Sequence, residues 1–241
     1  PALVGLGAIG LVYAVAVQLT MTPVHRGHVD DVPTGDDDGE GFLSNWSLLA
    51  DPRILATFLF FVLLTIASTG IQSFTVVFLT STFGLDVVVA NTTLTANLTA
   101  TAFGVLAGGV LADRFSIYRV LIGTLAAAGV LAGLLVAGGV PHAVAPTVVV
   151  FSVLGLVHGL ALPSRDSLVS TFSTSDSTGK SFGFAFTGVT IGAFIAPVML
   201  GVVSDTVNDV AMYALVSVFY LASLATVAVI YLGFVRRGGR A

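Results

Sequence analysis

Apolar runs long enough to cross a bilayer, separated by short charged or polar breaks, follow one another along the whole chain. A membrane-spanning helix needs about 20 mostly apolar residues. No Asp, Glu, Lys or Arg occurs between Pro1 and His25, between Arg53 and Asp86, or between Asp86 and Asp113. Later charges and prolines divide the remainder, so the pattern predicts an all-α, polytopic transmembrane helix bundle. The seven predicted spans cover residues 2–22, 55–80, 87–112, 118–140, 147–168, 181–203 and 210–234.

The composition supports a membrane protein. The 241 residues are 56% hydrophobic and only 9% charged, with a mean hydropathy of +1.02, whereas a soluble domain carries about 25% charged residues. Cysteine is absent, which excludes a disulfide framework and a thiolate metal site, and we expect no metal or cofactor. Residues 1–22 have neither a basic start nor a cleavage site, so they indicate a span rather than a signal peptide. Because the first residue is Pro1, we expect the chain to begin inside a longer protein.

All nine basic residues fall on one side of the membrane when the seven spans are placed. They are Arg26, Arg53, Arg114, Arg119, Arg165, Lys180, Arg236, Arg237 and Arg240. The opposite loops, near residues 81–86, 141–146 and 204–210, contain no Lys or Arg. Because basic residues accumulate in cytoplasmic loops, the sequence predicts an outside N-terminus and a cytoplasmic C-terminus in the plasma membrane. One lysine against eight arginines, together with an acidic loop, favours a salt-loving source.

A polar segment, residues 23–53, separates the first span from the six-helix part at 54–241. Six acidic residues lie within its positions 30–40: Asp30, Asp31, Asp36, Asp37, Asp38 and Glu40. With Gly and Pro between them, these acids cannot bury a core, so the composition is typical of a flexible cytoplasmic linker. The acids lack the alternating ligand spacing of a calcium-binding loop. The linker ends in a short apolar stretch suited to the membrane interface.

The segment GVLAGGVLADRFSIYR, residues 104–119, carries the most informative motif. Gly104 and Gly108 have the small-xxx-small spacing of packed membrane helices, and Gly109-x-x-x-Asp113-Arg114 follows at the predicted cytoplasmic end of a span. This core resembles the signature loop of the major facilitator superfamily, Gly-x-x-x-Asp-(Arg/Lys)-x-Gly followed by basic residues. The match is partial, because Ser116 replaces the second glycine and the basic Arg119 comes one position late.

The resemblance implies a solute transporter of twelve spans in two six-span halves, joined by a long cytoplasmic loop. Residues 1–22 then correspond to the sixth span, residues 23–53 to the joining loop, and residues 54–241 to the C-terminal half. The N-terminal half would be a missing partner of this chain. In the family the signature Asp latches the cytoplasmic side through a helix N-terminus, a charge–dipole interaction of about 0.3–1 kcal/mol. Asp113 would carry that role here.

A second pair of residues supports the same architecture. Gly201-x-x-x-Asp205 repeats Gly109-x-x-x-Asp113 at an offset of 92 residues, on the opposite side of the membrane. This placement is what the inverted three-plus-three repeat of the superfamily requires. The sixth predicted span also contains small residues and a proline suited to helix packing, namely Gly188, Gly192 and Pro197.

Polar side chains inside the spans are the candidates for a solute pathway. The family resemblance implies that the second, third, fifth and sixth predicted spans line a central cavity. Their candidates are Thr65, Ser68, Gln72, Thr75, Asn91, Thr95, His158, Thr187 and Thr190. Hydrogen bonding between helices is the alternative role for each of them. His158, the one ionisable side chain predicted near mid-membrane, could relay protons or stay neutral and bonded to a neighbouring helix.

The sequence therefore predicts a secondary active transporter, a permease or efflux protein, whose partners are a small organic solute and the lipid bilayer. The uncharged pathway candidates favour a neutral or amphipathic solute, and no nucleic acid partner is expected. A retinal protein is excluded because residues 210–234 contain no lysine for a Schiff base. No catalytic constellation indicates an enzyme. A seven-helix receptor and a non-transporting membrane scaffold remain as alternatives.

Overall fold

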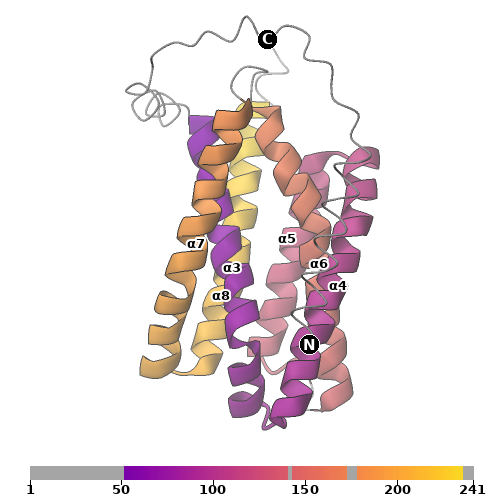
Figure 1. Ribbon diagram of the computed structural model, residues 1–241, viewed down its shortest axis with the longest axis vertical. Coiled ribbons are helices and arrows are strands. Elements are labelled where there is room, and N and C mark those ends of the chain that lie inside the picture. Colours follow the sequence, from indigo (N-terminus) through magenta and orange to yellow (C-terminus); the bar gives the residue numbers. More distant parts are fainter. Residues whose placement is uncertain (1–51, 141–142, 173–177, 236–241) are drawn as a thin grey trace, which may run out of the picture. The chain divides into compact units, whose positions relative to one another are not determined.

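Six long helices make up the part of the chain that the computed structural model describes, residues 52–140, 143–172 and 178–235 (Figure 1). Each is long and apolar enough to cross a membrane. They agree with the six predicted spans from 55–80 to 210–234, whereas the predicted span at 2–22 and the linker up to Asp51 lie outside the described residues. The helices are α3 (Pro52–Thr82), α4 (Val87–Arg114), α5 (Ile117–Val136), α6 (Val144–Thr171), α7 (Thr178–Thr206) and α8 (Asp209–Ile230), which continues into a π-helical turn, Tyr231–Val235.

Local chemistry sets the helix ends at the short loops. The Asp86 carboxylate accepts a hydrogen bond from the backbone N–H of Val88 and caps α4, and the Asn208 side chain caps α8 through Ala211 N. Such caps satisfy backbone donors that have no partner within the helix. Gly84 and Gly138 have φ values of 64° and 70°, a conformation that glycine adopts without a steric penalty. These devices keep the turns tight and the helices antiparallel.

The helices pack in a consistent set of neighbours. α4 lies along α6, α3 packs against α7 and α8, and α5 packs against α8 and α6. Figure 1 shows α3 and α7 side by side on one flank of the described bundle and α4 beside α6 on the other. Contacts of α4 with α5, and of α6 with α7, are sparse although these helices follow each other in the chain.

Glycines allow α4 and α6 to approach backbone to backbone. A Cβ at Gly155 would lie 2.2 Å from the Asn97 carbonyl oxygen, and one at Gly159 would lie 2.2 Å from the Thr101 carbonyl oxygen. From the other side, a Cβ at Gly104 would lie 2.3 Å from the Leu156 carbonyl oxygen, and Gly108 makes a similar approach to Leu160. Lipid gives no hydrophobic drive for helix association, so this close van der Waals packing is what holds the pair together.

The interface between α3 and α7 uses a second glycine pair. A Cβ at Gly188 would lie 3.0 Å from the Phe58 carbonyl oxygen, and one at Gly192 would lie 2.7 Å from the Val62 carbonyl oxygen. Gly201, farther along α7, has only an ordinary contact to Phe74. Pro197 lies inside α7 and is exposed, and the helix continues through it.

Tyr213 of α8 lies at the centre of a cluster of buried aromatic side chains. Its ring stacks on Phe78 of α3 at 3.9 Å between centroids and meets Phe151 of α6 edge-on at 6.2 Å. Its hydroxyl lies 2.7 Å from Thr75 Oγ1, which also donates to the Ile71 carbonyl. A fully buried phenol thus finds a polar partner within the bilayer, as a buried tyrosine requires.

Enlarging a glycine at the α4–α6 contact should destabilise the fold. Gly155→Ala places a methyl group against the backbone of α4, and we expect a loss of about 1–3 kcal/mol in unfolding free energy, typical of overpacking. Gly123→Ala on α5 is the matched control, because nothing lies within 4 Å of a Cβ there. Denaturant unfolding in mixed micelles measures both variants. Equal stability of the two would contradict the close contact.

Candidate functional site

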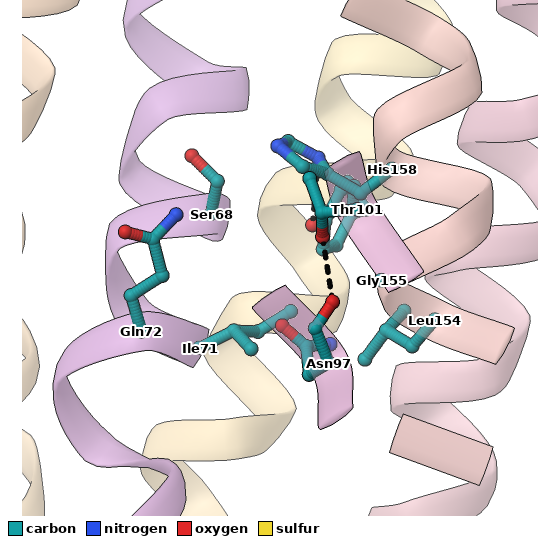
Figure 2. Close-up of a pocket in the computed structure, with 9 residues that line it drawn as sticks. Ser68, Ile71, Gln72, Asn97, Thr101, Leu154, Gly155 and His158 are labelled. Carbon is teal, nitrogen blue, oxygen red and sulfur yellow. Dashed lines mark hydrogen bonds between the residues drawn. The ribbon is translucent and has the colours of Figure 1, made fainter. Parts of the chain in front are cut away.

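A small polar pocket, with a cavity volume of about 10 Å³, lies where α3, α4, α6 and α8 meet. Figure 2 shows how its side chains converge from opposite helices. Ser68 and Gln72 of α3, which were predicted to line a pathway, contribute to the pocket, and so do Asn97 and Thr101 of α4. His158 on α6 and Tyr220 on α8 add an imidazole and a phenol. Ile71, Leu154 and Gly155 complete the lining.

The four predicted pathway candidates on α3 divide between this pocket and the helix interfaces. Thr65 is buried against α7, where its Cβ would lie 2.9 Å from a Cβ at Gly192. Thr75 is fully buried and bonded to Tyr213 of α8. Only Ser68 and Gln72, between these two positions, line the pocket. The structure therefore brings two of the four α3 candidates together with His158.

Most of the remaining candidates are exposed on the described bundle and bond to their own helix. Asn91 donates to Val87 O at 2.8 Å, Thr95 to Asn91 O at 2.9 Å, and Thr187 to Gly183 O at 2.9 Å. Thr190 donates to Phe186 O at 3.3 Å. A hydroxyl or amide that bonds the carbonyl one turn earlier needs no other partner for that donor. None of these four residues lines the pocket, and their exposure by itself does not indicate a solute.

Gln72 differs from all of these residues. It is exposed, it lies toward the middle of α3, and it makes no hydrogen bond to any described residue. Its amide has two N–H donors and an acceptor oxygen. Unsatisfied polar groups in hydrocarbon cost several kcal/mol, so this side chain requires water, a solute or another protein segment in front of it. Gln72 is the strongest single indication that the pocket faces a polar space.

His158 and Tyr220 form the inner wall of the pocket. Tyr220 Oη lies 3.3 Å from His158 Nδ1, and the two rings meet edge-on with centroids 6.2 Å apart. Asn97 completes this wall. Its side-chain Nδ2 donates to the Phe151 backbone carbonyl at 2.7 Å, and its backbone carbonyl accepts a hydrogen bond from Thr101 Oγ1. Tyr220 was not among the predicted residues, because the family resemblance assigned the cavity to four other helices. The sequence did hold one indication of Tyr220: it lies seven residues after Tyr213, which places two phenols on the same face of one helix.

Arg165, like Tyr220, has a role that the sequence did not predict; the sequence analysis identified it only as a basic residue. Its guanidinium carbon lies 4.9 Å from the ring centroid of Phe61 on α3 and 5.9 Å from that of Phe186 on α7. The side chain is only 14% exposed and pairs with Asp166 at 2.8 Å. Cation–π contacts of a desolvated arginine contribute about 2 kcal/mol. Arg165 thus joins α6 to α3 and α7, where backbone contacts are few.

The signature residues lie at the turn between α4 and α5. Asp113, Arg114 and Arg119 are all exposed, and none of them has a hydrogen bond or an ion pair with another described side chain. The amide of Phe115 still bonds Leu111 O, so α4 ends with the motif. Gly109 has nothing within 4 Å of an added Cβ, unlike Gly104 and Gly108 in the same helix. The Asp113 carboxylate is thus available at the end of the bundle.

A family model described as Major Facilitator Superfamily matches residues 2–197 and, in a second alignment, residues 57–240. The chain belongs to the Major Facilitator Superfamily. This confirms the resemblance drawn from Gly109, Asp113 and Arg114, and with six apolar helices it identifies a multi-pass membrane protein. Among the described residues, no group of three or more His, Asp or Glu side chains could hold a metal.

Solved structures of superfamily transporters share the fold. FucP in the outward conformation superposes with a TM-score of 0.71 at 19% identity, over 92% of this chain and 52% of FucP. A peptide transporter POT variant in complex with alafosfalin superposes with a TM-score of 0.67 at 20% identity, over 74% of this chain and 38% of the transporter. The POT family transporter PepTSo superposes with a TM-score of 0.65 at 16% identity, over 73% of this chain and 37% of PepTSo. This chain spans about half or less of these proteins. No curated protein matches it significantly.

Two amides of the pocket should behave oppositely when replaced. Asn97→Ala removes a buried hydrogen bond between α4 and α6, and we expect a loss of about 1 kcal/mol in unfolding free energy. Gln72→Leu removes no bond within the described residues, so we expect unchanged or slightly higher stability. Unfolding of both variants in the same mixed micelles provides the measurement. A destabilised Gln72→Leu protein would show that Gln72 is a packing residue.

Proposed function

We propose that the protein is a secondary active transporter of a small organic solute, working by alternating access, and that the described helices supply one half of its solute cavity. The observation that carries this proposal is the unsatisfied Gln72 amide, which lies in the interior of a membrane-spanning helix and lines the same pocket as His158. Lipid tails offer no hydrogen-bond partner, so such a group would be unsatisfied on a helix surface that faces only lipid. A water-filled cavity between two halves provides the partner.

The six described helices correspond, in this proposal, to spans seven to twelve. Residues 1–22 then form the sixth span, residues 23–53 the cytoplasmic linker, and an N-terminal half completes the transporter. The chain's coverage of 37–52% of the solved superfamily transporters supports this assignment. The pocket supports it as well, because Gln72, one of its polar residues, is exposed on the described bundle.

The inverted repeat belongs to the same proposal, and helix positions and packing support it. Pro52 and Val144, which begin α3 and α6, lie 92 positions apart, as do Ile117 and Asp209, which begin α5 and α8. This is the offset that relates Asp113 to Asp205. Exchanging α3 with α6, α4 with α7 and α5 with α8 converts the α4–α6 contact into α7–α3, and α3–α8 into α6–α5. Each main contact thus has a counterpart.

The cytoplasmic side is assigned to the end of the bundle that carries the basic residues. Arg53 and Arg119 lie in the first turns of α3 and α5, and Arg114 ends α4. Because successive helices run in opposite directions, all three residues lie at the same end of the bundle. The loops at the other end, residues 83–86 and 207–208, contain none. By the positive-inside rule this end is cytoplasmic. Asp113 then lies where a latch against the N-terminal half would act.

The solute in this proposal is neutral or amphipathic. Amide, hydroxyl, imidazole and phenol groups line the pocket, together with two aliphatic side chains, and the lining contains no carboxylate, lysine or arginine. A strongly charged solute would have no counter-charge in this half of the cavity. Sugars, sugar alcohols and nucleosides are therefore the first solutes to offer in a transport assay.

Transport by the full-length protein in vesicles tests the proposal and its latch. A panel of radiolabelled sugars, sugar alcohols and nucleosides is offered first, and uptake of a panel member above empty vesicles is expected. Asp113→Asn should then lower the turnover rate about two- to five-fold, because it removes a charge–dipole interaction of about 0.3–1 kcal/mol. Asp113→Glu, which keeps the charge, should recover part of the rate. Unchanged turnover in Asp113→Asn would refute the latch role.

A further inference from the structure

The Tyr220 hydroxyl has one hydrogen-bond partner in the described part of the chain. The residue is 1% exposed, and its Oη lies 3.3 Å from His158 Nδ1. No other described group accepts a hydrogen bond from it. A phenol buried in an apolar bundle must place its proton on an acceptor, because a buried donor left unsatisfied costs about 1–3 kcal/mol. The nearby nitrogen of His158 is the acceptor that the fold provides.

This requirement decides the tautomer of the imidazole. In a neutral histidine one ring nitrogen carries the proton and the other accepts. If Tyr220 donates to Nδ1, then Nδ1 carries the lone pair and the ring proton is on Nε2. The reverse arrangement, Nδ1–H donating to Tyr220 Oη, would leave the phenol proton without a partner. Tyr220 therefore selects the Nε2–H form, in the way that the bond at one ring nitrogen fixes the other.

The second ring nitrogen faces the pocket. Nε2 has no hydrogen-bond partner among the described residues, and Figure 2 shows the His158 ring on the side of α6 that faces Ser68 and Gln72 of α3. The groups on the packed helices are uncharged: Ser68 and Gln72 on α3, Asn97 and Thr101 on α4, and Tyr220 on α8. Arg165, a cation on the same helix, lies two turns farther along α6. An imidazolium here would have no counter-charge in the pocket lining, which favours the neutral ring.

We propose that Tyr220 is a positioning residue that holds neutral His158 as the Nε2–H tautomer, so that His158 donates a hydrogen bond to an oxygen acceptor of the transported solute. The proposal rests on the proposed transport function and deepens it. Gln72 lies across the same pocket and offers both a donor and an acceptor. Together the two side chains fit a neutral solute with a hydroxyl or carbonyl oxygen, and His158 acts as a ligand rather than as a proton carrier.

The tautomer is measurable without any transport assay. The full-length protein is labelled with ¹⁵N-histidine and placed in bilayers for solid-state NMR. The chain contains His25, His28, His142 and His158, and the spectrum of His158→Gln identifies the His158 signals by subtraction. We expect a protonated Nε2 and an unprotonated, hydrogen-bonded Nδ1. Tyr220→Phe should populate both tautomers, whereas Tyr213→Phe, one heptad earlier on α8, should leave the His158 signals unchanged.

Two results in this experiment would overturn the positioning role. One is a proton on Nδ1 of His158 in the native protein. The other is a Tyr220→Phe spectrum identical to the native one. A general loss of structure cannot imitate the expected result, because Tyr213→Phe also removes a buried phenol hydroxyl and its hydrogen bond.

The donor role is tested with the radiolabelled sugar, sugar alcohol or nucleoside that native vesicles take up. His158→Gln keeps an N–H near the position of Nε2, whereas His158→Asn places its amide near Nδ1. We expect a half-saturation concentration within about two-fold of native for His158→Gln and a rise of about three- to ten-fold for His158→Asn, the loss of one hydrogen bond. Equal values for the two variants would refute the donor role while transport itself stands. Native vesicles that take up no member of the panel would refute the proposed function and the solute contact, and the NMR result would still decide the tautomer.

Discussion

The backbone contact between α4 and α6 is the interaction on which the site depends. Gly104, Gly108, Gly155 and Gly159 remove the side chains that would separate the two helices, and carbonyl oxygens of each helix lie against glycines of the other. Because the helices are this close, the Asn97 amide reaches the Phe151 carbonyl. The same contact carries Thr101 to the pocket beside His158. Without hydrophobic drive in lipid, close packing of this kind must supply the specificity of the arrangement.

A second constraint, the satisfaction of polar groups in hydrocarbon, separates structural from functional side chains. Thr75 and Asn97 bond across helix interfaces, and Thr95 and Thr187 bond to their own helices. These groups need no solute. Gln72 and the Nε2 atom of His158 have no partner in the described bundle, and both open into one pocket. Hydrogen-bond geometry separates the structural side chains from the functional ones. Residue type alone cannot do so, because Thr, Asn and Gln are all uncharged polar residues.

The six described helices could be predicted from the sequence because span length and charge spacing follow directly from bilayer thickness. Gly109, Asp113 and Arg114 sufficed for the family, since their position at a turn between spans is specific. The site could be predicted only in part. Helical spacing places Thr65, Ser68, Gln72 and Thr75 on one face of α3, but it does not determine which neighbour each side chain meets. Tyr220 and Arg165 escaped prediction because their roles arise from contacts between helices far apart in the sequence.

The central claim is that Gln72 faces a water-filled solute pathway, and thiol accessibility tests it most directly. These 241 residues contain no cysteine, so each single replacement adds the one thiol of this part of the protein, and any cysteine outside it is first replaced by serine. Gln72→Cys and Val218→Cys in native membranes are treated with a membrane-impermeant thiol reagent. Val218 is a suitable reference because it lies mid-way along α8 and its apolar side chain is 54% exposed. The account predicts rapid labelling at position 72 and little at position 218. Equally slow labelling of both would contradict it.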